Sequence, residues 1–542
     1  MAMAAQRPEV FTRRASGLVR VMSPYSAFVY NILTMGLIFP WTYLWAPGAL
    51  PGGNLFWGIV FAMVLEIPIA LAYVWLSTAL PRSGGDYVFQ SRVFGGGIGF
   101  SIVMSGFVIW ILQWVALSGW LLAYLGFAPL FLGLGATVHS AAMTSLGLWF
   151  TSPWGIFITS IANALIALLL LVSGFKNYVR FQHVMWIATL LAFAIMLVVL
   201  FGTTPQSFAD KMNSFVVASG GQPNFYQTAL SAAKAKSIDL APPFSLMATL
   251  LVAPIAWTSL QWASYSAQQN GEIKNARSFR SQMIIIIGSL VVTGILLAIL
   301  AAAFEHAVGT DFLYVAGAGY WSGLSEGTFN GVYLWPNIVA MAIAQHPLVV
   351  LLIGIGYILN SFQIVNNCYI GMTRVMVAMS LDRLLPEWVS RVSDRLHTPV
   401  NAHIAYFIAS VPVIILYDFW GQWTALTLGV TFACGYVFVV TALAGALLPY
   451  RAKALYDASP GAQYRIGGLP AVTVIGGVGA VVGAIMVLMF IFYDAFGLTS
   501  ALARNVVIGV LIVSIVWYWL AKFMQKSRGI DVGFAFKEIP PE

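Results

Sequence analysis

Uncharged apolar segments of about 20 residues recur along the whole chain, and they constrain its fold more than any other feature. Each segment is long enough to cross roughly 30 Å of hydrocarbon as an α-helix. Only 8% of the 542 residues are charged, against about 25% in soluble proteins, which is too few to cover a water-facing surface. Because backbone polar groups must pair internally in hydrocarbon, helices are favoured. The sequence therefore predicts an all-α polytopic membrane protein with about 12 transmembrane helices.

The net charge of +8 is best explained by membrane topology. When the N-terminus is placed in the cytoplasm, the expected external segments contain few of the 26 lysines and arginines, namely Lys211, Lys234, Lys236 and Arg504. This asymmetry satisfies the positive-inside rule and predicts that both termini are cytoplasmic in a multi-pass plasma-membrane protein. The expected surroundings are the lipid bilayer, and no nucleic-acid partner is expected.

Residues that would support a disulfide framework, a metal site or an enzyme site are sparse. Cys368 and Cys434 both fall inside predicted spans, so disulfides are not expected. The polar N-terminus lacks a cleavage pattern, so we expect no removable signal peptide. No predicted span holds a histidine pair at metal-ligand spacing, and the glycine run 95–99 lacks the Lys-Ser/Thr of a phosphate loop. No metal and no cofactor are expected, and a membrane-embedded enzyme is the least favoured function.

The first apolar segment is interrupted near its middle. Asn31, Thr34 and Gly36 lie at mid-membrane depth, and Pro40 follows them. Each lowers helix stability in hydrocarbon unless the freed backbone groups find partners. One interpretation is a packing glycine with a proline kink. The other is a discontinuous helix whose exposed N–H groups hold a carboxylate.

The sixth apolar segment is also irregular. Pro254 lies in its interior, and Thr258 and Ser259 follow between two tryptophans, Trp257 and Trp262. Two interrupted helices five spans apart are typical of inverted-repeat transporters, whose substrate site lies at the membrane midplane. No residue-level repeat is visible between spans 1–5 and 6–10, which is usual for such folds.

Polar residues inside two other spans are candidates for ion coupling. Glu66 is the one carboxylate deep in the second span, where a charge costs about 2.5–3.5 kcal/mol. It is either functional or a structural glutamate kept protonated or hydrogen-bonded. The eighth span carries five polar residues: Asn360, Ser361, Gln363, Asn366 and Asn367. Positions 360, 363 and 367 share one helical face, which interhelical hydrogen bonds or a water-filled cation site would explain.

Three separated motifs resemble a single family. They are the loop Pro81-Arg-Ser-Gly-Gly-Asp-Tyr-Val-Phe-Gln-Ser-Arg92, the segment Glu272-Ile-Lys-Asn275, and the basic loop from Thr373 to Asn401. They are similar to the loops after helices 2, 6 and 8 of amino-acid/polyamine/organocation permeases. The chain is identified as a member of that superfamily. The resemblance implies the leucine-transporter fold, with five-plus-five inverted repeats, two further C-terminal helices and alternating access around a central site.

The resemblance also implies a division of the chain. The segments are a cytoplasmic N-terminal tail (1–22), a first repeat (23–202), an external loop (203–243), a second repeat (244–448), helices 11 and 12 (449–524) and a cytoplasmic C-terminal tail (525–542). The external loop is long enough for a surface helix or lid. The third span is expected over 97–127, followed by an external segment that ends at Pro153.

The resemblance places the substrate site at the two helix breaks. The helix-1 break falls on Thr34-Met35-Gly36, where only the last glycine of the family's Gly-Ser/Thr-Gly pattern is kept. The helix-6 break falls on Trp257-Thr258-Ser259, where no glycine stands. Substrate-binding residues are expected in both segments and at Ala256 and Trp262.

An amino-acid substrate is expected to bridge the two breaks. Its α-carboxylate would face N–H groups near Thr34 to Gly36, and its α-amino group would face carbonyls from Ala256 to Ser259. Trp257 or Trp262 would form a gate or pocket wall. Because neither break contains an acid or a base, a neutral and apolar amino acid is expected.

The coupling ion is left open between H⁺ and Na⁺. Many proton-coupled relatives carry a lysine in helix 5 where Thr189 stands here, so proton coupling by that route is unsupported. Glu66 could carry a proton, or Asn360 and Ser361 could help hold Na⁺; Thr189, at the position of that lysine, is also a coupling-ion candidate. A polyamine or nucleobase transporter on the same fold is the alternative function, and a non-transporting sensor is a distant one.

Overall fold

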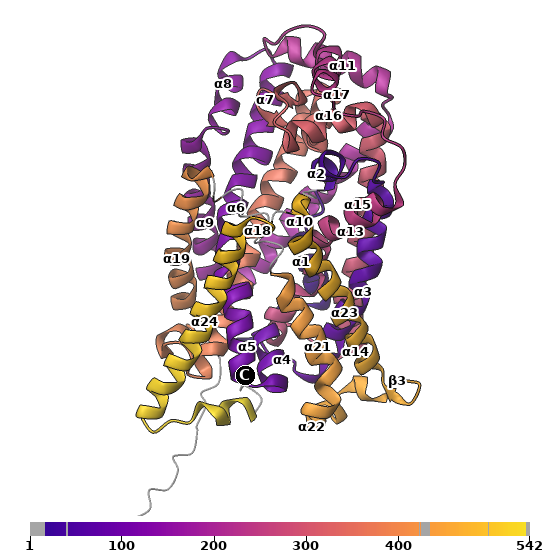
Figure 1. Ribbon diagram of the computed structural model, residues 1–542. Helices are drawn as coiled ribbons and strands as arrows, with labels where there is room; N and C mark the ends of the chain where they lie inside the picture. Colours follow the sequence, from indigo (N-terminus) through magenta and orange to yellow (C-terminus); the bar gives the residue numbers. More distant parts are fainter. Residues whose placement is uncertain (1–16, 39–41, 422, 424–433, 497, 538–542) are drawn as a thin grey trace, which may run out of the picture.

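A computed structural model of the chain describes residues 17–38, 42–421, 423, 434–496 and 498–537. Long helices run along one axis of an elongated bundle, and short helices and hairpins lie at its two ends (Figure 1). Within these residues, ten helices are long and apolar enough to cross a membrane. The prediction of an all-α polytopic membrane protein is confirmed.

Most predicted spans correspond to single long helices. They are α3 (Leu55–Ala79), α9 (Pro153–Val172), α10 (Phe175–Phe201), α13 (Leu246–Leu260) continued by the 3₁₀ helix η3 (Gln261–Gln268), α15 (Ser289–Val308), α18 (Pro347–Leu381), α19 (Val400–Phe419), α23 (Ala471–Phe492) and α24 (Ala501–Ser527). The tenth predicted span is represented by α21 (Gly435–Arg451), and part of its expected start, 424–433, lies outside the described residues. The first predicted span is divided into two short helices.

The third span is longer than the sequence predicted. It continues through α5 (Gly96–Val103), the π-helix η1 (Met104–Ile109), α6 (Ile111–Leu121), the π-helix η2 (Leu122–Phe127) and α7 (Ala128–Thr137). The segment expected to be external between Phe127 and Pro153 is therefore largely helical, and it contains α7 and α8 (Ala141–Trp149). Pro129 is the second residue after η2, whose wider turn tolerates the missing proline N–H.

Short elements gather at both ends of the bundle. One end, here called the capped end, carries α11 (Pro205–Ala218), α12 (Phe225–Ala235), α16 (Thr310–Trp321), η6 (Ser325–Gly327), the hairpin β1 (Thr328–Phe329) with β2 (Val332–Tyr333), and α17 (Pro336–Ala344) (top of Figure 1). The opposite end, here called the basic end, carries α4 (Gly85–Phe94), η4 (Asn270–Glu272), α14 (Phe279–Gln282), the π-helix η5 (Met283–Gly288), η7 (Glu387–Ser390), α22 (Lys453–Asp457), η8 (Pro460–Gln463), the hairpin β3 (Arg465–Ile466) with β4 (Leu469–Pro470), and η10 (Val532–Lys537). The segment 203–243, for which a surface helix or a lid was expected, contains the two helices α11 and α12.

The first span is a discontinuous helix, as one of the two interpretations predicted. The helix α1 (Pro24–Met35) begins at the N-cap Ser23 with proline in its first turn, and it ends where Gly36 adopts a φ of 78°. The chain resumes helix at α2 (Thr42–Ala49), and Pro40 lies outside the described residues. Because the α1 end is not followed by more helix, its last carbonyl groups are left for other partners.

The sixth span changes its helix type later than the sequence predicted. The α-helix α13 continues through Trp257, Thr258 and Ser259, and the 3₁₀ geometry begins at Gln261. Without a glycine at 257–259, nothing there releases the α-helical backbone. The two irregular helices pack together, because Asn31 Oδ1 of α1 accepts a hydrogen bond from the Ser266 backbone N–H of η3 at 2.9 Å.

Candidate functional site

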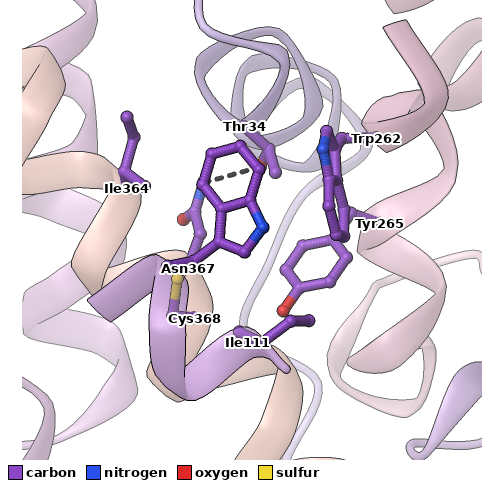
Figure 2. Close-up of a pocket in the computed structure, with 8 residues that line it drawn as sticks. Thr34, Ile111, Trp262, Tyr265, Ile364, Asn367 and Cys368 are labelled. Carbon is purple, nitrogen blue, oxygen red and sulfur yellow. Dashed lines mark hydrogen bonds between the residues drawn. The ribbon is translucent and has the colours of Figure 1, made fainter. Parts of the chain in front are cut away.

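A pocket lies beside the two irregular helices (Figure 2). Its lining residues come from α1 (Thr34), α6 (Ile111, Trp114), η3 (Trp262, Tyr265) and α18 (Ile364, Asn367, Cys368). None of these eight side chains carries a full charge. The cavity encloses about 30 Å³, whereas a cavity that holds benzene is about 150 Å³. The pocket is therefore contracted, and a larger ligand requires its walls to move.

The polar edge of the pocket joins α1 to α18. Thr34 Oγ1 accepts a hydrogen bond from Asn367 Nδ2 at 2.6 Å and donates one to the Tyr30 carbonyl at 2.6 Å. Asn367 Oδ1 accepts from Gln363 Nε2 at 2.6 Å and from the Tyr178 hydroxyl at 3.1 Å. Because each partner is buried, this arrangement fixes the Thr34 side chain at the end of α1.

The opposite wall of the pocket is aromatic. The Trp262 ring lies edge-on to Trp114, with centroids 5.7 Å apart, and edge-on to Tyr265 at 5.3 Å. Within the described residues, the indole N–H groups of Trp114 and Trp262 and the Tyr265 hydroxyl have no hydrogen-bond partner. Buried donors without acceptors are costly, so these groups favour a ligand or water that accepts hydrogen bonds.

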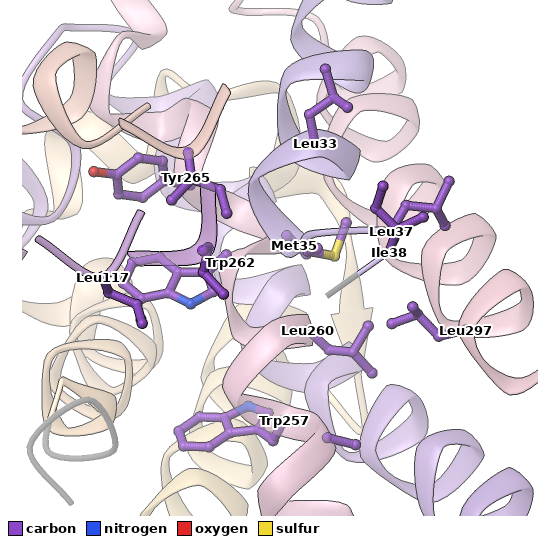
Figure 3. Close-up of a cluster of buried hydrophobic side chains, with 14 of the residues drawn as sticks. Leu33, Met35, Leu37, Ile38, Leu117, Trp257, Leu260, Trp262, Tyr265 and Leu297 are labelled. Carbon is purple, nitrogen blue, oxygen red and sulfur yellow. The ribbon is translucent and has the colours of Figure 1, made fainter. Parts of the chain in front are cut away.

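Some of the substrate residues predicted from the sequence lie at this pocket and some do not. Thr34 and Trp262 line it, and Met35 and Gly36 follow Thr34 at the end of α1. The residues Ala256, Trp257, Thr258 and Ser259 occupy the last turns of α13 and are not among the lining residues. Figure 3 shows the buried cluster around both breaks, with Met35, Leu37 and Ile38 from one and Trp257, Leu260 and Trp262 from the other.

Glu66 lies behind Trp257 rather than on the pocket wall. Its Oε2 accepts a hydrogen bond from Trp257 Nε1 at 2.6 Å, and the side chain is fully buried in α3. The Trp257 ring is 6.4 Å from Phe438, and Phe438 is 5.5 Å from Trp262. Glu66 is thus connected to the pocket through three aromatic side chains.

The other predicted coupling residues also lie away from the pocket lining. Ser361 Oγ donates to the Tyr357 carbonyl at 2.8 Å, within its own helix. Thr189 in α10 and Asn360 in α18 are buried, and within the described residues their side-chain polar atoms lack hydrogen-bond partners. Their role in ion coupling stays a prediction. In the part of the chain that the structure describes, no cluster of three His, Cys, Asp or Glu could hold a metal ion.

Six of the lining residues were not selected from the sequence. Tyr265 is three residues after Trp262, which places both on one face of a 3₁₀ helix. Ile111 and Trp114 are likewise three apart in α6, and Ile364 and Cys368 lie beside Asn367 on α18. Asn367 was recognised as part of a polar face but not as a pocket residue. Ile364 and Cys368 could have been predicted, because they lie one helical turn or less from Asn367 on α18. No local sequence feature indicated that α6 lines the pocket.

A network of buried ion pairs closes the basic end. Arg374 of α18 donates from Nε to one oxygen of Glu272 at 2.7 Å and from Nη2 to the other at 3.0 Å. Arg92 of α4 makes the same two-point contact with Asp382 at 2.6 and 3.1 Å. The Tyr87 hydroxyl also donates to Asp382, at 2.7 Å. All three motifs recognised in the sequence contribute residues to this network.

Asp86, in the first turn of α4 after the loop that ends at Gly84, joins three further elements. Asp86 accepts hydrogen bonds from Tyr73 of α3, Gln268 of η3 and Thr441 of α21. Burial raises the pKa of the Asp86 carboxyl to about 6, although its hydrogen bonds oppose this shift. Gly84 has a φ of 103°, and a Cβ there would approach Ala378 to 2.6 Å, so the loop requires glycine.

The chain preceding α1 is held at the same end. The Met22 backbone N–H donates to the Glu272 carbonyl at 3.0 Å, and the Lys274 N–H donates to the Met22 carbonyl at 2.8 Å. These bonds form a short parallel bridge between Met22 and Ile273. The start of α1 and the end of the sixth span are therefore fixed to each other, and Glu272 in turn is fixed to α18.

Comparison with known proteins agrees with this architecture. The sequence model of the family described as amino acid permease matches residues 25–513. A shorter match joins the chain to "Uncharacterized protein 399" of Sulfolobus islandicus rod-shaped virus 1, which is 34% identical over 83 residues. That alignment covers 15% of this chain and 21% of the viral protein. Because the family match includes both irregular helices and every pocket residue, this multi-pass membrane protein belongs to the amino acid permease family.

Proposed function

We propose that the protein transports neutral amino acids across the plasma membrane by alternating access around the pocket between α1, α6, η3 and α18. The observation that carries the proposal is the composition of this pocket: it lies beside the two irregular helices, and its lining is mostly aromatic and aliphatic, with no charged side chain. A zwitterion has no net charge, so an uncharged pocket can accept it when backbone dipoles meet its two ends.

The helix termini supply groups for those two ends. The Gly36 N–H is bonded to the Ile32 carbonyl, so the α-carboxylate expected at Thr34 to Gly36 is assigned here to the first N–H groups of α2, which begins at Thr42. The helix α1 ends at Met35, and its last carbonyl groups are suited to the α-ammonium group. The side chain of the substrate would then lie against Ile111, Trp262 and Ile364.

Release of the substrate requires the basic end to open. By the positive-inside rule we assign this end to the cytoplasm. The Arg374–Glu272 ion pair and the Met22–Ile273 bridge must separate before the pocket reaches the cytoplasm. The Thr34–Asn367 hydrogen bond links α1 to α18 at the pocket. A substrate that contacts Thr34 can therefore shift α1 and α18, whose far ends the ion pair and the bridge hold together.

Transport of a polyamine or another cation receives less support. A cationic substrate would favour an acidic side chain in the pocket. The buried Glu66 is bonded to Trp257 and is not among the lining residues. A nucleobase would also find the aromatic wall suitable, so it is included in the test.

The test is uptake by the purified protein in liposomes. Labelled neutral, acidic and basic amino acids, a polyamine and a nucleobase would be compared, with exchange against preloaded substrate measured as well. We expect neutral amino acids with aliphatic or aromatic side chains to enter, and Trp262→Ala to lose that activity. Trp420→Ala is the matched control, because Trp420 is 41% exposed at the end of α19. Uptake of the polyamine or nucleobase alone would refute the proposal.

A further inference from the structure

Glu66 is a buried carboxyl group with one hydrogen-bond donor. It lies near the middle of α3 and is 0% exposed. Its Oε2 accepts from Trp257 Nε1 at 2.6 Å, and within the described residues Oε1 has no hydrogen-bond partner. None of the ion pairs found in that part of the chain includes Glu66.

The elements packed against α3 supply no compensating cation at this depth. The helices α13, α23, η5 and η8 contain no titratable side chain. The titratable groups on the remaining neighbours are Tyr43 of α2, Asp86, Tyr87 and Arg92 of α4, Tyr265 of η3, Arg280 of α14, Glu305 and His306 of α15, and Tyr436, Tyr450 and Arg451 of α21. On α3 itself, Tyr73 is bonded to Asp86.

The cations in this set lie at the basic end. Arg280 follows Phe279, whose ring contacts Trp75 at 5.0 Å. Trp75 is nine residues beyond Glu66, about 13 Å along a helix. Arg451 ends α21, and Arg92 is paired with Asp382. A charged carboxylate at Glu66 would therefore be buried with a single neutral donor, which is strongly unfavourable.

The surroundings of Glu66 also connect it to the pocket. Trp257 belongs to the last turn of α13, directly before the change to η3. A Cβ at Gly435 would lie 2.8 Å from the Trp257 ring, so α21 packs closely on the indole. Phe438 of α21 then contacts both Trp257 and the pocket residue Trp262. A change at the carboxyl group can thus reach the pocket wall through packed rings.

We propose that Glu66 is a proton-binding site that couples transport to a proton gradient. The closed conformation holds the neutral acid, with its proton on a carboxyl oxygen. Opening towards one side admits water, which can solvate the carboxylate and accept the proton. A proton taken from water on one side is released to water on the other, and no other bond changes. This inference rests on the proposed transport function but names a different site from the substrate pocket.

The first experiment uses the wild-type chain in liposomes with a substrate from the transport assay. An inward pH gradient of one unit should drive accumulation, with an upper limit of about tenfold for one proton per substrate. A pH-sensitive dye inside the vesicles should report acidification when substrate enters. A sodium gradient without a pH gradient should drive no accumulation. Substrate exchange without lumenal acidification or pH-driven accumulation would overturn the inference and leave the transport function intact.

The variant Glu66→Gln separates a coupling role from a structural one. Glutamine keeps the size of the neutral acid and a carbonyl oxygen for Trp257, so we expect exchange within about twofold of wild type but no pH-driven accumulation. Asp418→Asn in α19 is the matched control, because both oxygens of this carboxyl group are also buried and lack hydrogen-bond partners within the described residues. It should accumulate substrate like the wild type. If Glu66→Gln still accumulates substrate with the pH gradient, the inference is wrong. If it does not fold, the dye measurement on the wild type still decides whether protons move with substrate.

Discussion

Arg374 and Glu272 form a buried two-point ion pair that joins α18 to the end of the sixth span. The two contacts measure 2.7 and 3.0 Å, and neither side chain is more than 1% exposed. The guanidinium also lies over the Phe175 ring at 4.8 Å. Because Glu272 is bonded through its carbonyl to Met22 as well, this pair connects α18 to the segment preceding α1. We interpret it as the main closure of the basic end.

Removing one partner of this pair should open the basic end. The variant Glu272→Gln leaves the Arg374 charge buried and uncompensated, which costs about 3–5 kcal/mol in comparable pairs. Water entry relieves that cost, so open conformations should gain population. We expect the thiol of Cys368, which lines the pocket and is 5% exposed, to react faster with a maleimide added from the basic side.

The second cysteine provides the control for that measurement. Cys434 is fully buried at the start of α21 and is not among the pocket-lining residues. Labelling would be measured with and without Glu272→Gln in two backgrounds. In Cys434→Ser, which keeps Cys368, Glu272→Gln should speed labelling. In Cys368→Ser, which keeps Cys434, it should not. Equal labelling of Cys368 with and without Glu272→Gln would contradict the closure role.

The side chain of Ile364 should limit substrate size. It lines the pocket from α18, so Ile364→Ala enlarges the contracted cavity. One methylene in an apolar pocket is worth about 1–3 kcal/mol of discrimination. We therefore expect kcat/KM for bulky neutral amino acids to rise about tenfold relative to small ones. Ile358→Ala, on the same helix but outside the lining, should leave the ratio unchanged, and a similar change in both variants would refute the assignment.

Loss of the Thr34 hydroxyl should impair substrate binding. In Thr34→Val the amide of Asn367 loses a partner at 2.6 Å, and a buried donor left unpaired costs about 1–3 kcal/mol. The change should appear as a KM increase of about fivefold to a hundredfold in uptake. Thr137→Val is a matched control, since among the described residues the Thr137 hydroxyl bonds only to carbonyls of its own helix turn. Unchanged KM in Thr34→Val would argue against a binding role.

Asp86 should make stability depend on pH. Burial raises its pKa from 3.8 to about 6 in the folded protein, so the folded state binds this proton more strongly than the unfolded state. Protonation of Asp86 therefore adds to the free energy of unfolding. This contribution is complete below about pH 4 and is lost as the pH rises through about 6, and it amounts to about 3 kcal/mol for two pKa units. Wild type should therefore lose thermal stability relative to Asp86→Asn between these pH values. A constant difference in melting temperature across that range would contradict this prediction.

The sequence indicated the fold because its strongest signals are local. Long apolar runs define spans, and Gly36 and Pro254 mark irregular helices without knowledge of their neighbours. The late change at Gln261 was missed because neighbouring helices, and not a local glycine, determine where α13 ends. The extension of the third span through α7 was missed because about 20–30 residues already cross a membrane, and nothing local requires the apolar helix to continue to Thr137.

The pocket was only partly predictable for a related reason. Thr34 and Trp262 belong to the irregular segments themselves, which the sequence marks. Trp114 and Ile111 come from α6, whose contact with η3 depends on how distant segments pack. Glu66 was recognised as unusual, but its bond to Trp257 follows from the packing of α3 on α13.

The most direct test of the proposed function is substrate protection of Cys368. Maleimide labelling would be followed in a Glu272→Gln, Cys434→Ser background while the concentration of a transported neutral amino acid is raised. If the substrate occupies the pocket lined by Thr34, Trp262 and Cys368, labelling should slow with half-protection near the concentration that half-saturates exchange in the same variant. If a transported amino acid leaves Cys368 labelling unchanged at saturating concentration, this pocket is not the transport site.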